Sequence, residues 1–437
     1  MNFPDTIYAL STGALPSGIA IVRLSGSGVR SAFDSLAGGT PPDRVARYCA
    51  FVDRESGLID RGIALYFPAP GSVTGEDCGE FHLHGGRAVV AAMLSALSRL
   101  PQFRMAEAGE FSRRAFLNGK MDLTSVEGLA DLISADTEAQ RRLALDNSGG
   151  LVRDLYLGWR AQMTTIRAHI EADLDFSDQE DVPGMVNPSL LNDMDRLAGE
   201  ISAHIGRYRR AEIIRGGFRV VILGRPNAGK SSLLNALAMR DAAIVSAEAG
   251  TTRDLVEVAL DVDGHKVIVT DTAGLRDDPG AIEEMGIDRA VRAAREADAI
   301  LRVTDPSDPG QISVPEGPPI LDVASKADLS PPRGPMSRTS IRVSAHTGEG
   351  IEVLLNRIRD MARSETGNVG EVLPFRARHV EQLQACAEHL LRARDAADEE
   401  VSAEEMRLAS NALGAIVGLV GAEEVLGEIF SAFCIGK

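Results

Sequence analysis

The sequence predicts a multidomain protein with an α+β N-terminal domain, an all-α helical domain split in sequence, and an inserted α/β P-loop domain. Three observations indicate this class. Strand-like and helical segments alternate in the middle of the chain, and helical periodicity dominates on both sides of that block. A glycine-rich phosphate-loop motif, GRPNAGKS at 224–231, directly follows the first strand expected in the middle block.

Length and composition are those of a globular protein. The 437 residues suggest two to four domains at about 150 residues each. Hydrophobic residues make up 44% and charged residues 25%, which excludes wholesale disorder. The net charge of −17 argues against coating nucleic acid by phosphate neutralisation, and 4% aromatic residues argue against a stacking platform for single strands. A local basic patch can still bind RNA.

Cysteine usage and hydropathy predict a cytoplasmic protein without a membrane span. The four cysteines are scattered with no C-x-x-C pair, so they form neither a disulfide framework nor a zinc pattern. The opening MNFPD does not resemble a basic-then-apolar leader. The longest apolar stretch, Ala88 to Leu97, is far shorter than the roughly 18 residues that a span needs.

The first two blocks cover residues 1–118 and 119–213. In the first, Ile19–Leu24 and Ile63–Phe67 predict strands, and Ala88–Leu100 predicts a helix, so we expect a small α+β domain. The second block is the first part of the helical domain. Its apolar residues recur at helical spacing, at Met163, Ile166, Ile170 and Leu174 and again at Leu190, Leu191, Met194, Leu197 and Ile201.

The α/β block spans residues 214–366, and the second part of the helical domain spans 367–437. Helical segments lie between several of the strands, which favours a parallel sheet that binds a nucleotide. Residues 305–319 are punctuated by Pro and Gly and are expected to form a loop. The expected strands are Phe218–Leu223, Lys266–Thr270, Ala299–Val303, Pro319–Val323 and Ile341–Ser344, and the last block has an apolar helical face at Val380, Leu383, Ala387, Leu390 and Leu391.

The phosphate loop lies between the strand Phe218–Leu223 and the helical run Leu233–Ala238, which is the context the motif requires. Glycines let backbone N–H groups surround the phosphates, and the helix N-terminus adds a favourable dipole. We expect Lys230 to reach the β- and γ-phosphates and Ser231 to bind Mg²⁺.

Four further elements follow in the expected order. DTAG at 271–274 ends a strand, GTTRD at 250–254 contains the switch threonine Thr252 as a Mg²⁺ ligand, and SKAD at 325–328 and Ser344-Ala345 each follow a strand. Asp328 can accept two hydrogen bonds from guanine, which opposes an ATPase. The pattern is typical of a GTPase of the translation-factor-related class. The candidate nucleotide-binding residues are Asn227, Ala228, Gly229, Lys230, Ser231, Ser232, Ser246, Gly250, Thr251, Thr252, Asp271, Thr272, Ala273, Gly274, Ser325, Lys326, Asp328, Ser344 and Ala345.

The guanine motif departs from its usual form. It ordinarily reads Asn-Lys-x-Asp, and Ser325 replaces the Asn here. Loss of the amide is expected to weaken a tether between loops.

The spacing of the motifs does not identify the residue that positions the attacking water. Leu275 occupies the place where many small GTPases have Gln, so another polar group is needed, and Glu283 and Glu284 lie just downstream. Arg253 and Arg276 are candidate arginine fingers, or solvated switch residues.

Asn227 could help to supply the positive charge of an arginine finger in a different way. Its side-chain oxygen could hold a monovalent cation where an arginine would otherwise lie, or it could form a plain hydrogen bond.

Beyond the nucleotide motifs, the chain resembles the TrmE (MnmE) family of tRNA modification GTPases over essentially its full length. The resemblance rests on DTIYAL near the start, IVRLSG at 21–26, GED at 75–77, HGG at 84–86, GEFSRRAFLNGKMDL at 109–123 and the C-terminal FCIGK. It implies an N-terminal folate-binding and dimerisation domain, a split helical domain and an inserted GTPase domain. It also implies a homodimer that pairs with MnmG (GidA), an FAD-dependent protein, as a heterotetramer, so that FAD enters only through the partner.

The resemblance implies an activity as well. The complex would form a carboxymethylaminomethyl or aminomethyl group on carbon 5 of the wobble uridine of certain tRNAs, using 5-formyl- or methylene-tetrahydrofolate. GTP would be the substrate of a K⁺-activated, Mg²⁺-dependent hydrolysis. The implied K⁺ ligands are Asn227, Ser246, Glu248 through its carbonyl, and Thr251, with Ser231 and Thr252 on Mg²⁺ and Glu283 positioning the water.

The implied folate contacts are Arg23, Glu80, Lys120 and Lys437. Arginine and lysine can pair with the carboxylates of folate, and Glu80 can accept pterin N–H bonds. Each residue alone would also fit an ordinary surface role. With Lys437 near folate, Cys434 becomes a candidate for a catalytic or site-shaping role, although free cysteines are usually small buried hydrophobes.

Two alternatives remain at this level. Arg207-Tyr-Arg-Arg210 and Arg376-Ala-Arg378-His379 are candidate tRNA or partner contacts, or solvated helix faces. The protein could also be a GTP-dependent regulatory switch or ribosome-assembly factor without modification chemistry. The N-terminal block and the FCIGK tail argue against that second reading, because a timer needs no folate pocket.

Overall fold

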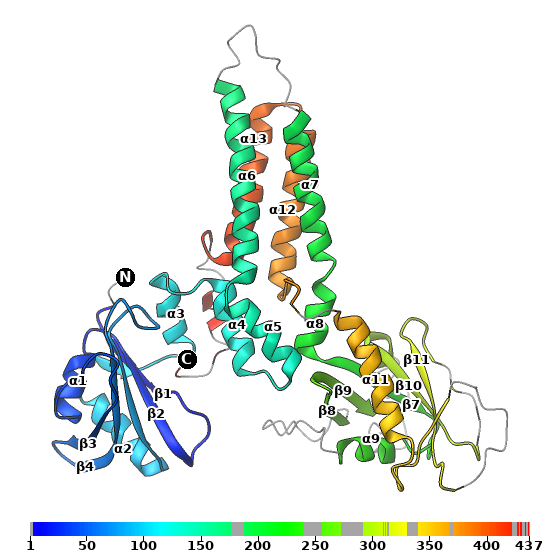
Figure 1. Cartoon of the computed structure of the whole chain (residues 1–437), viewed down its shortest axis with the longest axis horizontal. Coiled ribbons are helices and arrows are strands. Elements are labelled where there is room, and N and C mark those ends of the chain that lie inside the picture. Colours follow the sequence, from blue (N-terminus) through cyan, green and yellow to red (C-terminus); the bar gives the residue numbers. More distant parts are fainter. Residues whose placement is uncertain are drawn as a thin grey trace, which may run out of the picture. The chain divides into compact units, whose positions relative to one another are not determined.

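The computed structural model describes residues 3–175, 188–239, 256–271, 292–308, 314–329, 340–367 and 370–421, with residues 310, 312, 426, 427, 429, 430, 433 and 436 (Figure 1). The chain splits into two compact units. Met1–Ala130, Arg153–Val186 and Asp395–Lys437 form unit 1, and Asp131–Val152 and Asn187–Arg394 form unit 2. The expected boundaries at residues 118, 213 and 366 stay predictions.

Unit 1 contains a six-stranded sheet in the order β3-β4-β5-β2-β1-β6. All its pairs are antiparallel except β1 with β6. The strands are β1 (Thr6–Leu10), β2 (Ser17–Ser25), β3 (Arg47–Asp53), β4 (Gly57–Phe67), β5 (Cys78–Gly85) and β6 (Phe103–Met105). The helices α1 (Val29–Leu36) and α2 (Arg87–Ser98) supply apolar side chains to the core on one face of the sheet.

Strand alternation decides which residues face that core. In β2, Val22 and Leu24 are buried in the core with Phe33 of α1, whereas Arg23 between them is only half-buried. In β5, Phe81 is a core residue and Glu80 alternates with it. Because successive side chains point to opposite faces, Arg23 and Glu80 lie on the face away from α1 and α2.

Unit 1 also contains helices outside the sheet region. They include α3 (Glu110–Leu117), α4 (Leu123–Ile133), α6 (Leu151–Asp175) and α13 (Glu399–Val417), of which α4 and α6 each extend a few residues into unit 2. The Asp398 carboxylate caps α13 by accepting a hydrogen bond from Glu400 N. Phe430 and Phe433, near the C-terminus, pack against Leu123 and Val126 of α4.

The helices of unit 2 with described bounds include α5 (Glu138–Ser148), α7 (Pro188–Ile205), α8 (Tyr208–Gly216), α11 (Ile351–Thr366) and α12 (Ala377–Asp395), together with α9 (Lys230–Ala238). The predicted periodicity of α7 is confirmed, because Leu190, Met194, Leu197 and Ile201 are all buried. A capping box of Thr137 and Gln140 begins α5.

The second sheet lies in unit 2 and has the order β12-β11-β10-β7-β9-β8. Its strands are β7 (Phe218–Gly224), β8 (Val256–Val262), β9 (His265–Asp271), β10 (Ala299–Thr304), β11 (Ile320–Ala324) and β12 (Ile341–Arg342). The five predicted strands are confirmed, and all of them are parallel. The antiparallel strand β8 was missed, because it alternates apolar residues with Glu257 and Asp261 instead of forming an apolar run.

Two smaller expectations also hold in the part of the chain that the structure describes. Residues 305–319 contain no helix or strand there, as the Pro and Gly pattern predicts. No described helix is both long and apolar enough to cross a membrane.

Candidate nucleotide site

The phosphate loop joins β7 to α9 at the carboxyl edge of the parallel sheet, where ligands bind in open α/β folds. Two of its glycines are required by geometry. A Cβ on Gly224 would lie 2.5 Å from Val303 O, and Gly229 has a φ of +86°. Helix α9 begins directly after Gly229, so its first N–H groups face the loop.

Lys230 is the lysine of this loop, and it is only 7% exposed. Its Nζ donates to Gly224 O at 3.0 Å and to Arg225 O at 2.9 Å. These carbonyls hold the ammonium group inside the loop, where it can reach phosphate oxygens without a large rearrangement.

Ser231 and Asp271 meet across the sheet edge. Strands β7 and β9 pair in register, with Ile222 opposite Asp271, which brings the end of β9 beside the loop. Ser231 Oγ donates to Asp271 Oδ2 at 2.6 Å, and Asp271 is buried. A hydroxyl and a carboxylate oxygen form the kind of donor set that Mg²⁺ prefers, so the residues present fit this ion.

The guanine-reading elements also converge. Ser344 Oγ donates to Asp328 Oδ1 at 2.6 Å, and this hydrogen bond is the main cause that lowers the pKa of Asp328. Asp328 is therefore held ionised, as an acceptor for guanine N–H groups. Ala345 follows Ser344 directly in the chain.

Asp305 is a residue of this region that the sequence analysis did not assign. Its Oδ2 lies 2.8 Å from Nζ of Lys326, whose φ of +55° is left-handed. Burial alone would raise the pKa of Asp305, but the bonds from Lys326 and Ser307 outweigh it and lower the pKa to about 2. An Asp directly after the strand beside β11 was the available signal.

Asn227 lies at the tip of the phosphate loop. Its side chain is exposed, and its φ of +61° is in the left-handed region, which asparagine tolerates better than most residues. Ser232 follows in the first turn of α9 and is also exposed.

The remaining expected positions lie outside the described residues. They are Ser246, Glu248, Gly250, Thr251, Thr252, Arg253, Thr272, Ala273, Gly274, Leu275, Arg276, Glu283, Glu284, Cys434 and Lys437.

A second cluster lies on the face of the unit 1 sheet that is turned away from α1 and α2. Arg23 Nη2 is 3.1 Å from Glu80 Oε1, and His82 Nε2 is 3.0 Å from Glu80 Oε2. The His82 hydrogen bond and the Arg23 charge outweigh burial and lower the pKa of Glu80. The structure thus brings two implied folate contacts together, and it adds His82, which alternates with Glu80 along β5 and could have been found from that spacing.

Different contacts locate Lys120 and the C-terminal tail. A Cβ on Gly75 would lie 3.2 Å from Lys120 Cε, which puts Lys120 against the loop that leads into β5. Gly436 O accepts a hydrogen bond from Ser11 Oγ at 2.9 Å, directly after β1. With a φ of +98° and an added Cβ only 2.2 Å from Leu10 O, position 436 requires glycine. The tail therefore returns to the strand that neighbours Arg23.

The basic clusters of the helical segments are engaged within the protein. Arg207 and Arg210 both pair with Glu371, at 3.3 and 2.6 Å, and Arg376 pairs with Asp131 at 2.9 Å. These ion pairs give the three arginines a role in packing within the protein, and their contact with tRNA stays a prediction.

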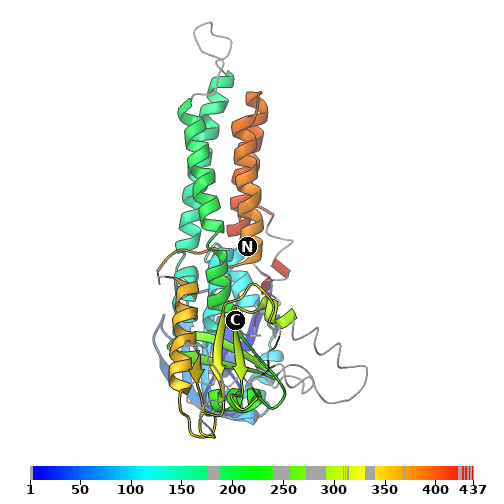
Figure 2. The same cartoon turned by 90° about the vertical axis from the view of Figure 1, so that its right-hand side faces the viewer.

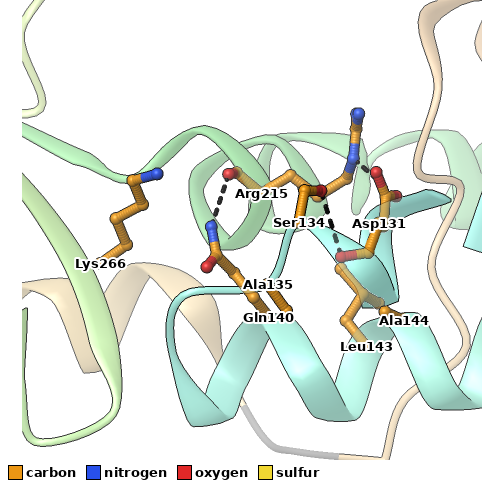
Figure 3. Close-up of a pocket in the computed structure, with 8 residues that line it drawn as sticks. All are labelled: Asp131, Ser134, Ala135, Gln140, Leu143, Ala144, Arg215 and Lys266. Atoms are coloured by element: carbon orange, nitrogen blue, oxygen red, sulfur yellow. Dashed lines mark hydrogen bonds and ion pairs between the residues drawn. The ribbon is translucent and has the colours of Figure 1, made fainter. Parts of the chain in front are cut away.

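A cavity of about 210 Å³ lies elsewhere in unit 2 (Figure 3). Arg215 Nε is 3.0 Å from Asp131 Oδ2, and Gln140 Nε2 donates to Arg215 O at 2.8 Å. None of the nucleotide-motif residues lines this cavity. Its lining comes from the region where α4, α5, α8 and β9 pack together. Its lining residues are Asp131, Ser134, Ala135, Gln140, Leu143, Ala144, Arg215 and Lys266.

Two known protein families match this chain, one in its N-terminal part and one over the remainder. Residues 123–434 match the family described as MnmE helical domain, and residues 6–120 match the one described as GTP-binding protein TrmE N-terminus. The tRNA modification GTPase MnmE of Chelativorans sp. (strain BNC1) is 51% identical over 435 residues, covering 99% of this chain and 98% of that protein. The MnmE of Mesorhizobium japonicum is 51% identical over 439 residues, covering 99% of each.

Two solved structures show a limited similarity to this chain. The G domain of the FeoB iron transporter of T. maritima has a TM-score of 0.26 at 23% identity, covering 33% of this chain and 98% of that one. Era of Aquifex aeolicus has a TM-score of 0.27 at 22% identity, covering 40% and 66%. The family matches span both blocks that flank the phosphate loop, and the chain belongs to the MnmE (TrmE) family of tRNA modification GTPases.

Proposed function

We propose that this protein hydrolyses GTP in a K⁺-activated reaction and couples it to modification of the wobble uridine of tRNA. The observation that carries the first half is the pairing of two sites on one sheet edge. Ser231 with Asp271 is suited to Mg²⁺ and phosphate, and Asp328 with Ser344 is suited to guanine. The second half is supported by membership of the family whose relatives are named tRNA modification GTPases.

In the hydrolysis step, water attacks the γ-phosphorus and the bond to the bridging oxygen breaks. Lys230 neutralises charge on the β- and γ-phosphates, and the first N–H groups of α9 hold their oxygens. Ser231 and Thr252 would hold Mg²⁺, which would supply further charge neutralisation when bound. Glu283 positions the attacking water.

K⁺ is proposed to supply the positive charge that an arginine finger provides in other GTPases. Its ligands would be Asn227, Ser246, Glu248 through its carbonyl, and Thr251. Support comes from Asn227, because its side chain in the phosphate loop is exposed and carries an oxygen that can bind a cation. That position is compatible with G domains that meet across a homodimer.

The modification chemistry is proposed to use the Arg23–Glu80 face of unit 1. A tetrahydrofolate one-carbon donor would bind there, with Lys120 and Lys437 near its carboxylates and Cys434 close by. The return of Gly436 to the end of β1 supports a site that includes the C-terminal tail. The partner would be the FAD-dependent MnmG in a heterotetramer, and the product a carboxymethylaminomethyl or aminomethyl group on carbon 5 of uridine.

Two measurements test these halves separately. Nucleoside analysis of tRNA from cells lacking the protein is expected to show loss of the modified wobble uridine, and unchanged wobble uridines would refute the modification role. GTP turnover is expected to be faster in K⁺ than in Na⁺ buffer, and Asn227→Ala is expected to remove that difference. Equal turnover of the unaltered protein in the two buffers would refute the cation model.

Cys434 has its own test. Cys434→Ser is expected to lower tRNA modification in cells while GTP turnover stays unchanged. Full modification by the variant would remove Cys434 from the proposed chemistry.

A further inference from the structure

Ser325 occupies the position where the guanine motif usually has asparagine, and it is only 4% exposed. Its Oγ lies 2.7 Å from Ala228 O and 3.2 Å from Thr304 O. A hydroxyl has one proton to donate, so it serves one of these carbonyls at a time. Thr304 O already accepts a hydrogen bond from the Ser325 backbone N at 3.0 Å. We therefore assign the hydroxyl proton of Ser325 to the shorter bond, with Ala228 O as its acceptor.

This bond joins the two halves of the nucleotide site. Ala228 belongs to the phosphate loop, is buried, and precedes Gly229, where an added Cβ would lie 3.7 Å from Ser325 Cβ. On the other side, Ser325 begins the segment that carries Lys326 and Asp328. The hydroxyl thus adds a direct link between the phosphate-binding and guanine-binding loops to the sheet that carries both.

We propose that Ser325 is a positioning residue that holds the phosphate loop in register with the guanine-binding loop, and that its single donor makes nucleotide release faster than an amide would. An asparagine amide has two N–H donors, so it could serve a second acceptor where the hydroxyl cannot. The inference rests on the proposed GTP binding and concerns the lifetime of the bound nucleotide.

The test measures release of a fluorescent GDP analogue from the full-length protein after addition of excess unlabelled GDP. Ser325→Ala removes the donor, and release is expected to become about three- to ten-fold faster, the change typical of one neutral hydrogen bond. Ser325→Asn is expected to slow release. KM for GTP is expected to rise in Ser325→Ala, because faster release weakens nucleotide binding.

Thr366→Val is a matched control. Thr366 Oγ1 is also buried and donates to a backbone carbonyl, Ala362 O at 3.0 Å, but it lies within α11. Loss of that hydroxyl is expected to lower stability as much as Ser325→Ala does, without changing nucleotide release.

The outcomes separate this inference from the proposed function. If the unaltered protein binds no guanine nucleotide, the proposed function fails. If it binds GDP and Ser325→Ala releases it at the unaltered rate, or no faster than Thr366→Val, the positioning role is refuted. If Ser325→Asn binds GDP and releases it no more slowly than the unaltered protein, the comparison of serine with an amide is refuted.

Discussion

Arg114 is the centre of a buried charge network in unit 1, and its removal is expected to destabilise that unit strongly. The side chain, on α3, is only 1% exposed. Its guanidinium lies 2.8 Å from Asp5 Oδ1, 3.1 Å from Glu76 Oε2 and 3.2 Å from Glu110 Oε1. Replacing it by methionine keeps much of the volume but leaves three carboxylates without this cation.

The expected cost follows from what each carboxylate retains. Breaking a buried pair by removing one partner costs about 3–5 kcal/mol. Asp5 and Glu110 keep Arg104 at 2.5 Å, and Glu76 keeps a hydrogen bond from Ser25 Oγ at 2.7 Å. We therefore expect Arg114→Met to lower the free energy of unfolding by about 3 kcal/mol, at the lower end of that range.

The assay uses the only tryptophan of the chain, Trp159, which is buried in α6 of unit 1. Its fluorescence follows urea unfolding of this unit. At about 1–3 kcal/mol per molar urea, the midpoint is expected to fall by about 1–3 M. Arg113→Met is the control, because Arg113 is the exposed neighbour on the same helix and is expected to change stability by less than about 0.5 kcal/mol.

The effect is also expected to depend on pH. Burial alone raises the pKa values of Asp5 and Glu110, but the arginines outweigh it and lower both. Carboxyls with lowered folded-state pKa stabilise the protein above their unfolded pKa, near 4, and lose that contribution as the pH falls. The difference between Arg114→Met and the unaltered protein is therefore expected to be full at pH 7 and smaller below pH 4. A loss under about 1 kcal/mol at pH 7, or one equal to that of Arg113→Met, would refute the reasoning.

Three further predictions concern unit 2. Burial and the nearby charges of Arg207 and His379 lower the pKa of His204 to about 4, so the free energy of unfolding is expected to fall as the pH drops from 6.5 to 4. His204→Leu is expected to abolish about 2 kcal/mol of the loss between pH 7 and pH 5. Urea unfolding followed by circular dichroism measures this difference. Asp328→Asn is expected to weaken GTP binding by about 100-fold and to favour xanthosine triphosphate, measured by competition titration, because the charged acceptor for two N–H groups is lost. Lys230→Ala is expected to lower GTP turnover by at least about 100-fold with an unchanged circular dichroism spectrum.

Local patterns predicted most of the inserted domain and its nucleotide site. The strands β7, β9 and β11 are apolar runs, and motif residues lie at or directly after their carboxyl ends. Parallel strands align their carboxyl ends, and residues distant in sequence, such as Ser231 and Asp271, therefore meet at one edge of the sheet.

Other features could not be predicted because they depend on pairs that no local pattern encodes. Strand β8 is an edge strand whose alternation is partly polar, and His82 and Asp305 gain their roles only from Glu80 and Lys326. The Glu80 contact with Arg23 joins residues 57 positions apart.

The sequence by itself determined the class of each block, the family and the chemistry of the nucleotide motifs, because these depend on residue type and short-range order. The tertiary structure decided which charges are paired. It placed Arg207, Arg210 and Arg376 in internal ion pairs, although their spacing equally allowed contacts with tRNA. It also supplied the Ser325 contact with Ala228, 97 positions away. Such contacts are set by the packing of whole elements, and one residue's identity becomes meaningful only when its distant partner is known.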